Sequence, residues 1–320
     1  MCKKRTALAL ILLAAVFMSL SCSSAPAKEK LKIMLIVKAE DSTFWKTVLQ
    51  GAQAAGSEYD VDIIFRGSDK EDDYETQNRL IEDAVTQNAD AVVLSACDFD
   101  KTVPSAHKVM DAGIPLITID SGINTDRDVL FIGTNNYAAG QMAAETLAEL
   151  TGEAAVIGIV NFEEGSGNAI ERYQGFLDTI AGYPGITVAD TRFSKSNLEA
   201  PRKATLDMLG KNPDITAIVA FNEWTTLGAG YAIKEAGRSD STVMVGFDNN
   251  VKSIIMLEDG DIDTLIIQNP FAMGYLGVKY AIDAINGQKI PETTETATVA
   301  INRNNMYNTE NQKLLFPFAR

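Results

Sequence analysis

The sequence is poor in the residues that most metal and nucleophile sites require. Its 320 residues include one histidine, His107, and three cysteines. Cys2 and Cys22 lie in the N-terminal segment, which leaves Cys97 alone in the rest of the chain, so no disulfide is expected there. A zinc site or a histidine-based triad has too few ligands or bases. We therefore expect no metal ion, no catalytic residue and no enzyme activity, and we interpret His107 as a surface or packing residue.

Basic residues are also scarce relative to acids. The chain has 28 lysines and arginines against 43 aspartates and glutamates, a net charge of −15. Because phosphate binding draws on clustered Lys and Arg, this balance is a poor match for nucleic acid. We expect no nucleic-acid partner.

Nucleotide and hydrolase motifs are missing or incomplete. The sequence has no phosphate loop ending in Gly-Lys-Ser or Gly-Lys-Thr, and no Gly-x-Ser-x-Gly elbow. Gly165-Ser-Gly167 follows a predicted strand and opens a predicted helix, but Ile170 stands where a dinucleotide fingerprint has its third glycine. These absences favour a chain that holds no cofactor.

The N-terminal segment has the order of an export signal. Basic residues 3–5 precede an apolar stretch at 7–17, and small residues then lead to Cys22. A helix that spans the hydrocarbon of a membrane needs about 20 apolar residues, and this run is shorter. We predict a cleaved signal peptide over residues 1–21.

The junction from Met18 to Cys22 resembles a bacterial lipobox, although its leucine stands two residues before the cysteine where the usual pattern has three. The resemblance implies a diacylglycerol on Cys22, which cleavage leaves as the first residue. The small, polar segment that follows suits a tether, which we assign to residues 22–30. We therefore predict an exported protein, periplasmic or on the cell surface, that is lipid-anchored to the membrane.

From Leu31 onward, short β-branched runs alternate with amphipathic stretches. Strands are expected at 31–37, 61–66, 91–96, 115–120, 129–134, 154–160, 186–193, 217–221, 243–248 and 264–268. Helices are expected at stretches such as 44–55, 74–87, 137–150, 225–236 and 271–286. Strict alternation predicts an α/β fold with parallel sheets covered by helices on both faces.

The alternating pattern runs twice, which predicts two doubly wound lobes. With 46% hydrophobic residues, the chain can bury two ordinary cores. We assign residues 31–134 with 269–297 to an N-terminal lobe and residues 135–268 with 298–320 to a C-terminal lobe. The chain then crosses between lobes near Thr134, Gln268 and Ala297, and these three segments would form a hinge.

Polar and aromatic side chains stand where the predicted strands end. In open parallel sheets, ligands bind beyond the carboxyl ends of the strands. The residues at these ends are Lys38, Ser42, Phe44, Trp45, Asp120, Ser121, Asn222, Glu223, Phe247 and Asp248. Carboxylates and amides pair with sugar hydroxyls, and aromatic faces pack on the C–H faces of a sugar ring. The set therefore favours a small polyhydroxylated ligand.

Six stretches closely resemble the ribose-type periplasmic sugar-binding proteins, in order and with matching spacing over nearly the whole chain after the signal. They are residues 36–45, 113–122, 171–176, 221–223, 245–248 and 268–270. The resemblance implies a type I periplasmic binding protein fold, whose two lobes close on a sugar and present it to an ABC permease in the membrane. It also implies ring-stacking roles for Phe44, Trp45 and Phe247, and hydroxyl-binding roles for Asp120, Arg172, Asn222, Asp248 and Gln268.

Three positions depart from the ribose binders. Lys38 stands where they carry a small polar residue, Ser121 follows Asp120 where they carry an arginine, and Ser42 replaces an asparagine. Lys38, Glu163 and Glu223 are candidate specificity residues. Lys38 either serves an acidic sugar or pairs with Asp41.

A lysine at position 38 and an Asp-Ser pair also resemble the autoinducer-2 receptors of the same fold, whose ligand is a small polyhydroxylated furanone. Those receptors place other residues around the second-lobe half of the site, where this chain keeps Arg172, Asn222, Asp248 and Gln268. We therefore expect a sugar or sugar-like polyol, with autoinducer-2 or another small polar signal as the alternative.

Two further classes share the two-lobe architecture. Sugar-responsive repressors need a DNA-reading helix-turn-helix before the first lobe, and the export signal occupies that place. A surface sensor remains open, because one closed form can dock on a permease or on a membrane receptor. We expect a monomer in either case.

Overall fold

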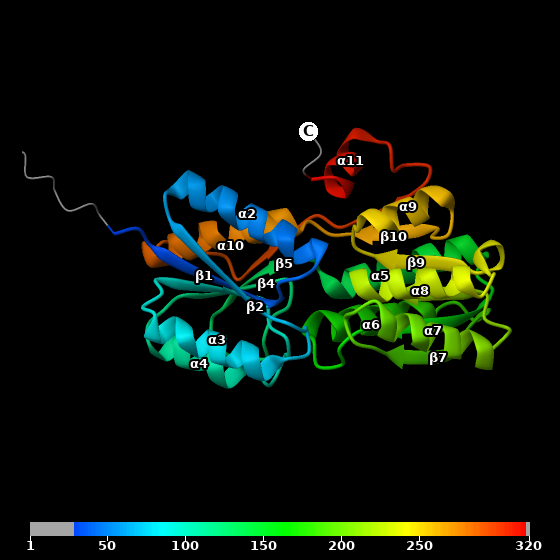
Figure 1. Ribbon diagram of the computed structural model, residues 1–320, viewed down its shortest axis with the longest axis horizontal. Coiled ribbons are helices and arrows are strands. Elements are labelled where there is room, and N and C mark those ends of the chain that lie inside the picture. Colours follow the sequence, from blue (N-terminus) through cyan, green and yellow to red (C-terminus); the bar gives the residue numbers. More distant parts are fainter. Residues whose placement is uncertain (1–28, 318–320) are drawn as a thin grey trace, which may run out of the picture. The chain divides into compact units, whose positions relative to one another are not determined.

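The strands form two separate sheets (Figure 1), in a computed structural model that describes residues 29–317. The predicted signal peptide and lipidation at Cys22 lie outside the described residues. The strands are β1 (Lys32–Ala39), β2 (Asp62–Ser68), β3 (Ala91–Leu94), β4 (Leu116–Ile119), β5 (Leu130–Gly133), β6 (Ala155–Asn161), β7 (Ile186–Phe193), β8 (Ala217–Ala220), β9 (Val243–Phe247), β10 (Thr264–Ile267), β11 (Thr293–Glu295) and β12 (Val299–Asn302).

Helices connect nearly all successive strands. They are α2 (Thr43–Tyr59), α3 (Tyr74–Thr86), α4 (Val103–Asp111), α5 (Asn136–Thr151), α6 (Gly167–Ile180), α7 (Glu199–Lys211), α8 (Glu223–Glu235), the short η1 (Ser239–Ser241), α9 (Val251–Asp259), α10 (Pro270–Ile285) and α11 (Thr309–Leu315). Within residues 29–317, no helix combines the length and apolar character needed to cross a membrane.

Both sheets are doubly wound. The first has the strand order β11-β5-β4-β3-β1-β2 and the second β12-β10-β9-β8-β6-β7. All neighbours run parallel except β12, which runs antiparallel to β10 at the sheet edge. This arrangement confirms the predicted fold class of two parallel-sheet α/β lobes.

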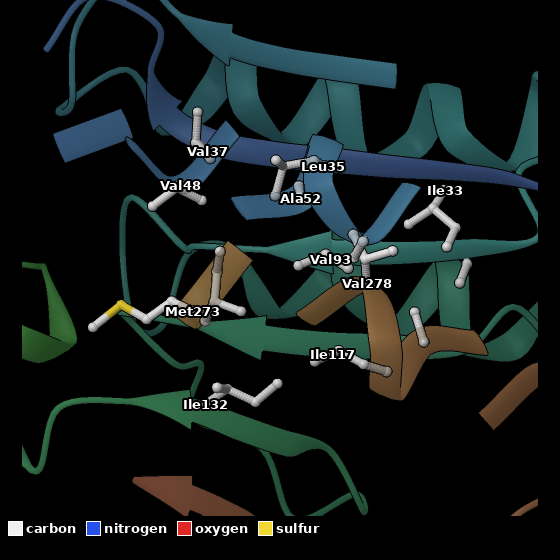
Figure 2. Packing of buried hydrophobic residues seen from close by; sticks show 14 of the residues in the cluster. Ile33, Leu35, Val37, Val48, Ala52, Val93, Ile117, Ile132, Met273 and Val278 are labelled. Atoms are coloured by element: carbon white, nitrogen blue, oxygen red, sulfur yellow. The ribbon is translucent and has the colours of Figure 1, made fainter. Parts of the chain in front are cut away.

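The core of the first lobe follows from alternation along its strands. In β1, Ile33 and Leu35 pack with α2 and α10, whereas Met34 and Ile36 belong to a second cluster with α3 and α4. Figure 2 shows the first of these clusters, where side chains of β1 meet those of α2 and α10. A strand whose two faces are both buried reads as a continuous apolar run, as this one does.

Two helices pack on the lobe opposite to the strand that precedes them. After β5, the chain crosses at Thr134 and Asn135, and α5 packs against strands of the second sheet. After β10 it crosses back at Gln268 and Asn269, and α10 lies beside α2 on the first sheet (Figure 1). A third crossing joins β11 to β12. The lobes thus share three connections.

Candidate ligand-binding site

Two aspartates occupy corresponding places at the ends of β4 and β9. Asp120 and Asp248 have left-handed backbone conformations, with φ of 57° and 69°. Aspartate tolerates this region better than most residues because its short polar side chain bonds locally. Each backbone N–H donates to the adjacent strand, to Ile132 and Ile266. The sharp turn leaves both carboxylates buried at the carboxyl edges of the two sheets.

Lys38 and Asp120 of the first lobe meet Asn168 of the second. The Lys38 ammonium donates to Ser166 Oγ at 2.6 Å and to Asn168 Oδ1 at 3.0 Å. The Asn168 amide donates to both oxygens of Asp120 at 3.1 Å. Lys38 lies 3.7 Å from the Asp120 carboxylate. Asp41 instead pairs with Lys46, so the expected alternative of a Lys38–Asp41 pair is wrong.

Arg172, early in α6, connects several residues in the part of the site that the second lobe provides. Its guanidinium donates to Asn136 Oδ1 at 2.9 Å, to the Phe221 carbonyl at 2.7 Å and to Gln268 Oε1 at 2.8 Å. The guanidinium carbon stacks 4.7 Å from the centre of the Phe247 ring. Phe247 is fully buried. Phe247 therefore packs against the guanidinium of Arg172 and does not line the cavity described in a later paragraph.

Gln268 joins the site to the crossings between the lobes. Its amide donates to Asp248 Oδ1 at 2.6 Å. Its oxygen also accepts from the Thr134 hydroxyl at 2.9 Å, and Thr298 donates to Thr134 at 3.2 Å. One residue from each of the three crossings therefore belongs to a single hydrogen-bonded group beside the site.

Glu223 binds the start of a helix in the opposite lobe. Its carboxylate accepts from the backbone N–H groups of Thr43 at 3.3 Å and Phe44 at 3.2 Å. These N–H groups belong to the first turn of α2 and have no acceptor within the helix itself. Negative charge is favoured at this end of a helix. Ser42 caps the same helix by accepting from the Trp45 backbone. Asn222 caps α8 through a reciprocal pair with Thr225, and its amide donates to Ser196.

Aromatic side chains and one further acid complete the wall. Phe44 and Trp45 pack edge to face, 4.9 Å between ring centres. The Trp45 indole N–H donates to Glu71 Oε1 at 2.8 Å. Glu71 is 8% exposed. Glu71 lies just before α3, and its side chain turns inward to Trp45.

These residues line one cavity between the lobes. Its free volume is about 30 Å³, room for only one or two water molecules. A bound solute therefore requires side chains or lobes to move apart. The lining residues are Lys38, Ser42, Phe44, Trp45, Glu71, Asp120, Phe162, Asn168, Arg172, Asn222, Glu223, Trp224, Asp248 and Gln268.

Of the predicted site residues, the cavity brings together all except Ser121 and Phe247. Ser121 is buried, and its hydroxyl has no hydrogen-bond partner among the described residues. Cys97 is buried beside a neighbouring cavity, and burial raises the pKa of its thiol. His107 is partly buried, contacts Thr125 at 2.9 Å and does not line the cavity. No cluster of metal-ligating side chains occurs in the described part of the chain.

Burial dominates the electrostatics of the cavity. It raises the pKa of Asp248 to about 6, although Arg172 favours the charged form. It raises the pKa of Glu71 to about 7, and the nearby charge of Glu163 adds to the effect. It also raises the pKa of Glu223, against the hydrogen bonds from Asn250 and α2. The site thus holds several carboxylates whose charge the protein compensates only in part.

Comparison with known proteins decides the family. Residues 33–289 match the periplasmic binding protein domain. The chain belongs to the periplasmic binding protein family. Members are exported proteins that bind solutes for transport, which confirms the expectation of a binding protein and not an enzyme.

Relatives of this periplasmic binding protein are named for sugars. The D-ribose/D-allose-binding protein of Pseudomonas aeruginosa is 29% identical over 282 residues, 85% of this chain and 88% of the relative. The D-apiose import binding protein of Actinobacillus succinogenes is 32% identical over 236 residues, 73% and 75% of the two chains. An ABC transporter solute binding protein from Agrobacterium vitis, solved with bound D-fucose, has a TM-score of 0.86 at 31% identity and covers 89% and 99%.

Four residues that line the cavity of this periplasmic binding protein were not predicted. They are Glu71, Phe162, Asn168 and Trp224. Phe162 directly follows β6 and Trp224 follows Glu223, so the strand-end argument applied further along the chain would have found both. Asn168 lies beside the Gly165-Ser-Gly167 segment, where the start of a helix faces the cleft. Glu71 carried no such signal, because it lies in a polar loop with three other acids, Asp69, Asp72 and Asp73.

Proposed function

We propose that this chain is an extracytoplasmic solute-binding protein that captures a sugar or sugar-like polyol and delivers it to an ABC importer. One observation carries the proposal. The cavity between the lobes combines carboxylates, amides and a guanidinium with aromatic side chains, the mixture that recognises hydroxyls and ring C–H faces together. The names of the relatives, which include ribose, allose and apiose binders, support it.

Binding would proceed by closure of the lobes about the three crossings. An open form admits the ligand, side chains of both lobes complete its hydrogen bonds, and the bound form rests closed. The small free volume of the cavity means that side chains or lobes must move apart before a solute can enter. The hydrogen bonds among Thr134, Gln268 and Thr298 tie the crossings to the ligand-facing Asp248, so ligand contact and hinge are adjacent.

Attachment to the membrane would come from a diacylglycerol on Cys22, after removal of residues 1–21. The residues between Cys22 and β1 then act as a tether that keeps a monomeric binding protein near its permease. Mass spectrometry of the exported protein tests this point: we expect an N-terminal lipid-modified Cys22, and an unmodified N-terminus elsewhere would contradict it.

Thermal unfolding with a ligand panel tests the function. The purified protein is unfolded and refolded to strip bound solute, then heated with D-ribose, D-allose, D-apiose, D-fucose, polyols, sugar acids and autoinducer-2. A ligand at a hundred times its dissociation constant adds about 2.7 kcal/mol, enough to raise the midpoint by several degrees. We expect a shift with one neutral sugar. A shift with the furanone alone would instead indicate a signal receptor, which the sugar-named relatives do not favour.

Two substitutions test the site. Arg172→Ala and Asp248→Ala each remove a charged hydrogen-bond partner worth about 1.5 to 3 kcal/mol, so each should weaken sugar binding at least about tenfold. Isothermal titration with the sugar found in the panel measures the loss. Unchanged affinity in both variants would show that the ligand binds elsewhere.

A further inference from the structure

Glu71 is a buried acid with an open acceptor in the proposed sugar site. It lies in the loop between β2 and α3 and faces the cavity beside Trp45. One carboxylate oxygen accepts from the Trp45 indole at 2.8 Å. Within the described residues, its other oxygen accepts no hydrogen bond. Because Glu71 lines the cavity, this free oxygen is available to a donor that comes from outside the protein.

The charge around Glu71 gives the same indication. Burial raises the pKa of Glu71 to about 7, and the charges of Glu163 and Asp120 raise it further. Lys38 and the indole of Trp45 oppose the shift only in part. The protein thus leaves this carboxylate short of donors, and a hydroxyl hydrogen bond would stabilise its charged form.

The cations of the cavity are already engaged by protein acceptors. Lys38 donates to Ser166 and Asn168 and lies 3.7 Å from Asp120. Arg172 donates to three protein oxygens and is balanced by the charge of Asp248. The lining carboxylates, Glu71, Asp120, Glu223 and Asp248, outnumber these two cations. A ligand that carries its own negative charge would meet repulsion without a free cationic partner.

From these contacts, and resting on the proposed function, we propose that Glu71 is a further ligand-binding and specificity residue. Its second carboxylate oxygen accepts a hydrogen bond from a hydroxyl of a neutral sugar, while the acidic cavity excludes sugars that carry a carboxylate or a phosphate. Lys38 then serves to join the lobes through Ser166 and Asn168, and does not select an acidic sugar.

Isothermal titration compares the wild type with Glu71→Gln. The neutral probes are D-ribose, D-allose, D-apiose and D-fucose, and the anionic probes are D-ribose 5-phosphate and D-galacturonate. We expect the wild type to bind a neutral probe and neither anion. Glutamine keeps an acceptor for the Trp45 indole but loses the charge-assisted bond to the ligand, so Glu71→Gln should weaken binding of that sugar about tenfold or more.

Two controls separate ligand contact from structural support. Glu75→Gln removes an exposed acid in the first turn of α3 and should leave the affinity unchanged. Monodeoxy derivatives of the bound sugar provide the second control. If Glu71 accepts from one hydroxyl, removing that hydroxyl should abolish the difference between the wild type and Glu71→Gln, while removing another should preserve it. A merely structural role would give the same difference for every derivative.

The possible failures are distinguishable. A folded Glu71→Gln variant that binds the neutral sugar as tightly as the wild type would overturn the proposal and leave the proposed function intact. Wild-type preference for D-galacturonate or D-ribose 5-phosphate would overturn the exclusion of anions, again without affecting the solute-binding role. If the wild type binds none of the probes, the proposed function fails and this inference fails with it.

Discussion

Asp248 illustrates how closely the polar residues of the site depend on one another. Its carboxylate accepts from Gln268 at 2.6 Å and from the backbone of Glu223 at 2.9 Å, while Arg172 stacks nearby on Phe247. Each group satisfies its neighbour, so removal of one leaves another buried without a partner. Substitutions at this site will therefore change both ligand affinity and the stability of the protein.

The raised pKa of Asp248 predicts a pH dependence of stability. In the unfolded chain an aspartate ionises near pH 3.9, whereas burial raises the pKa of Asp248 to about 6 in the folded protein, with Arg172, Glu223 and Asp120 as the charges that face it. Between these values the folded state binds more protons than the unfolded state. The free energy of unfolding therefore falls as the pH rises, by at most about 1.4 kcal/mol per pH unit from this group, and the loss is complete above pH 6.

Denaturant unfolding from pH 4 to 8 measures this slope in the wild type, Asp248→Asn and Glu71→Gln. Asp248→Asn should flatten the decline between about pH 4 and pH 6. Because burial raises the pKa of Glu71 to about 7, Glu71→Gln should flatten it up to pH 7. Equal slopes in all three proteins would mean that neither carboxyl changes its proton affinity on folding.

The sequence indicated some of these residues and concealed others for a physical reason. Asp120 and Asp248 stand directly after apolar strands, and the carboxyl ends of parallel strands meet at one edge, so both could be placed in the cleft. Glu71 reaches the cavity from the loop before α3 and Asn168 from the first turn of α6, where only the folded backbone determines which side chain turns inward. The support of Arg172 by Phe247 likewise depends on packing that no local pattern encodes.

At the scale of elements, one helix contact fixes the position of Arg172. Helices α5 and α6 cross so closely that a Cβ at Gly140 would lie 2.1 Å from the carbonyl oxygen of Arg172, and one at Gly175 would lie 2.1 Å from that of Tyr137. Glycine at both positions allows the two backbones to touch. The helix that carries Arg172 is therefore held against α5 at the level of this cavity-lining residue.

Gly140→Ala should separate these helices. We expect the free energy of unfolding to fall by about 1 to 3 kcal/mol, as for other overpacked interiors, and sugar binding to weaken because Arg172 moves with α6. Gly210→Ala, in α7, is the matched control: a Cβ there would meet nothing within 4 Å, so alanine should raise stability by up to about 1 kcal/mol. Urea unfolding of both variants measures the difference, and a Gly140→Ala protein as stable as the wild type would contradict the close crossing.

The interior elements of both sheets were predictable because they are long apolar runs or strongly periodic helices. β11 and β12, each at one edge of its sheet, were not predicted. β11 has the sequence Thr-Thr-Glu with mostly exposed side chains, and β12 has only four residues, one of them fully buried. Such segments are held by pairing with β5 and β10, a tertiary contact, and their own sequence gives little preference for a strand.

At the scale of the whole molecule, direct bonds between the lobes affect closure. Glu223 of the second lobe accepts from the first turn of α2, and Lys38 of the first lobe donates to Ser166 and Asn168 of the second. These bonds stabilise a closed arrangement independently of any solute. The affinity for a ligand then depends partly on residues that do not touch it, because they change the fraction of closed protein.

Glu223→Gln should shift the solute-free protein toward the open form. A neutral amide interacts less strongly with the helix start, by about 0.3 to 2 kcal/mol, so the radius of gyration from small-angle X-ray scattering should increase and the affinity should fall severalfold. Glu235→Gln is the control, since this acid lies on the same helix α8 but pairs with Arg202 inside the second lobe. If the two variants scatter identically without solute, Glu223 has no part in closure.

Each lobe contains elements from late in the chain, and this determines when during synthesis its core can be completed. The core of the first lobe includes Met273, Val278 and Ala281 from α10, and that of the second includes Ile301 and Leu315 from the last elements of the chain. A polypeptide that emerges with its N-terminus first has made nearly all of its length before either core is complete. Neither half, cut at the first crossing, contains everything that its own lobe needs, so the two lobes must mature together at the end of synthesis.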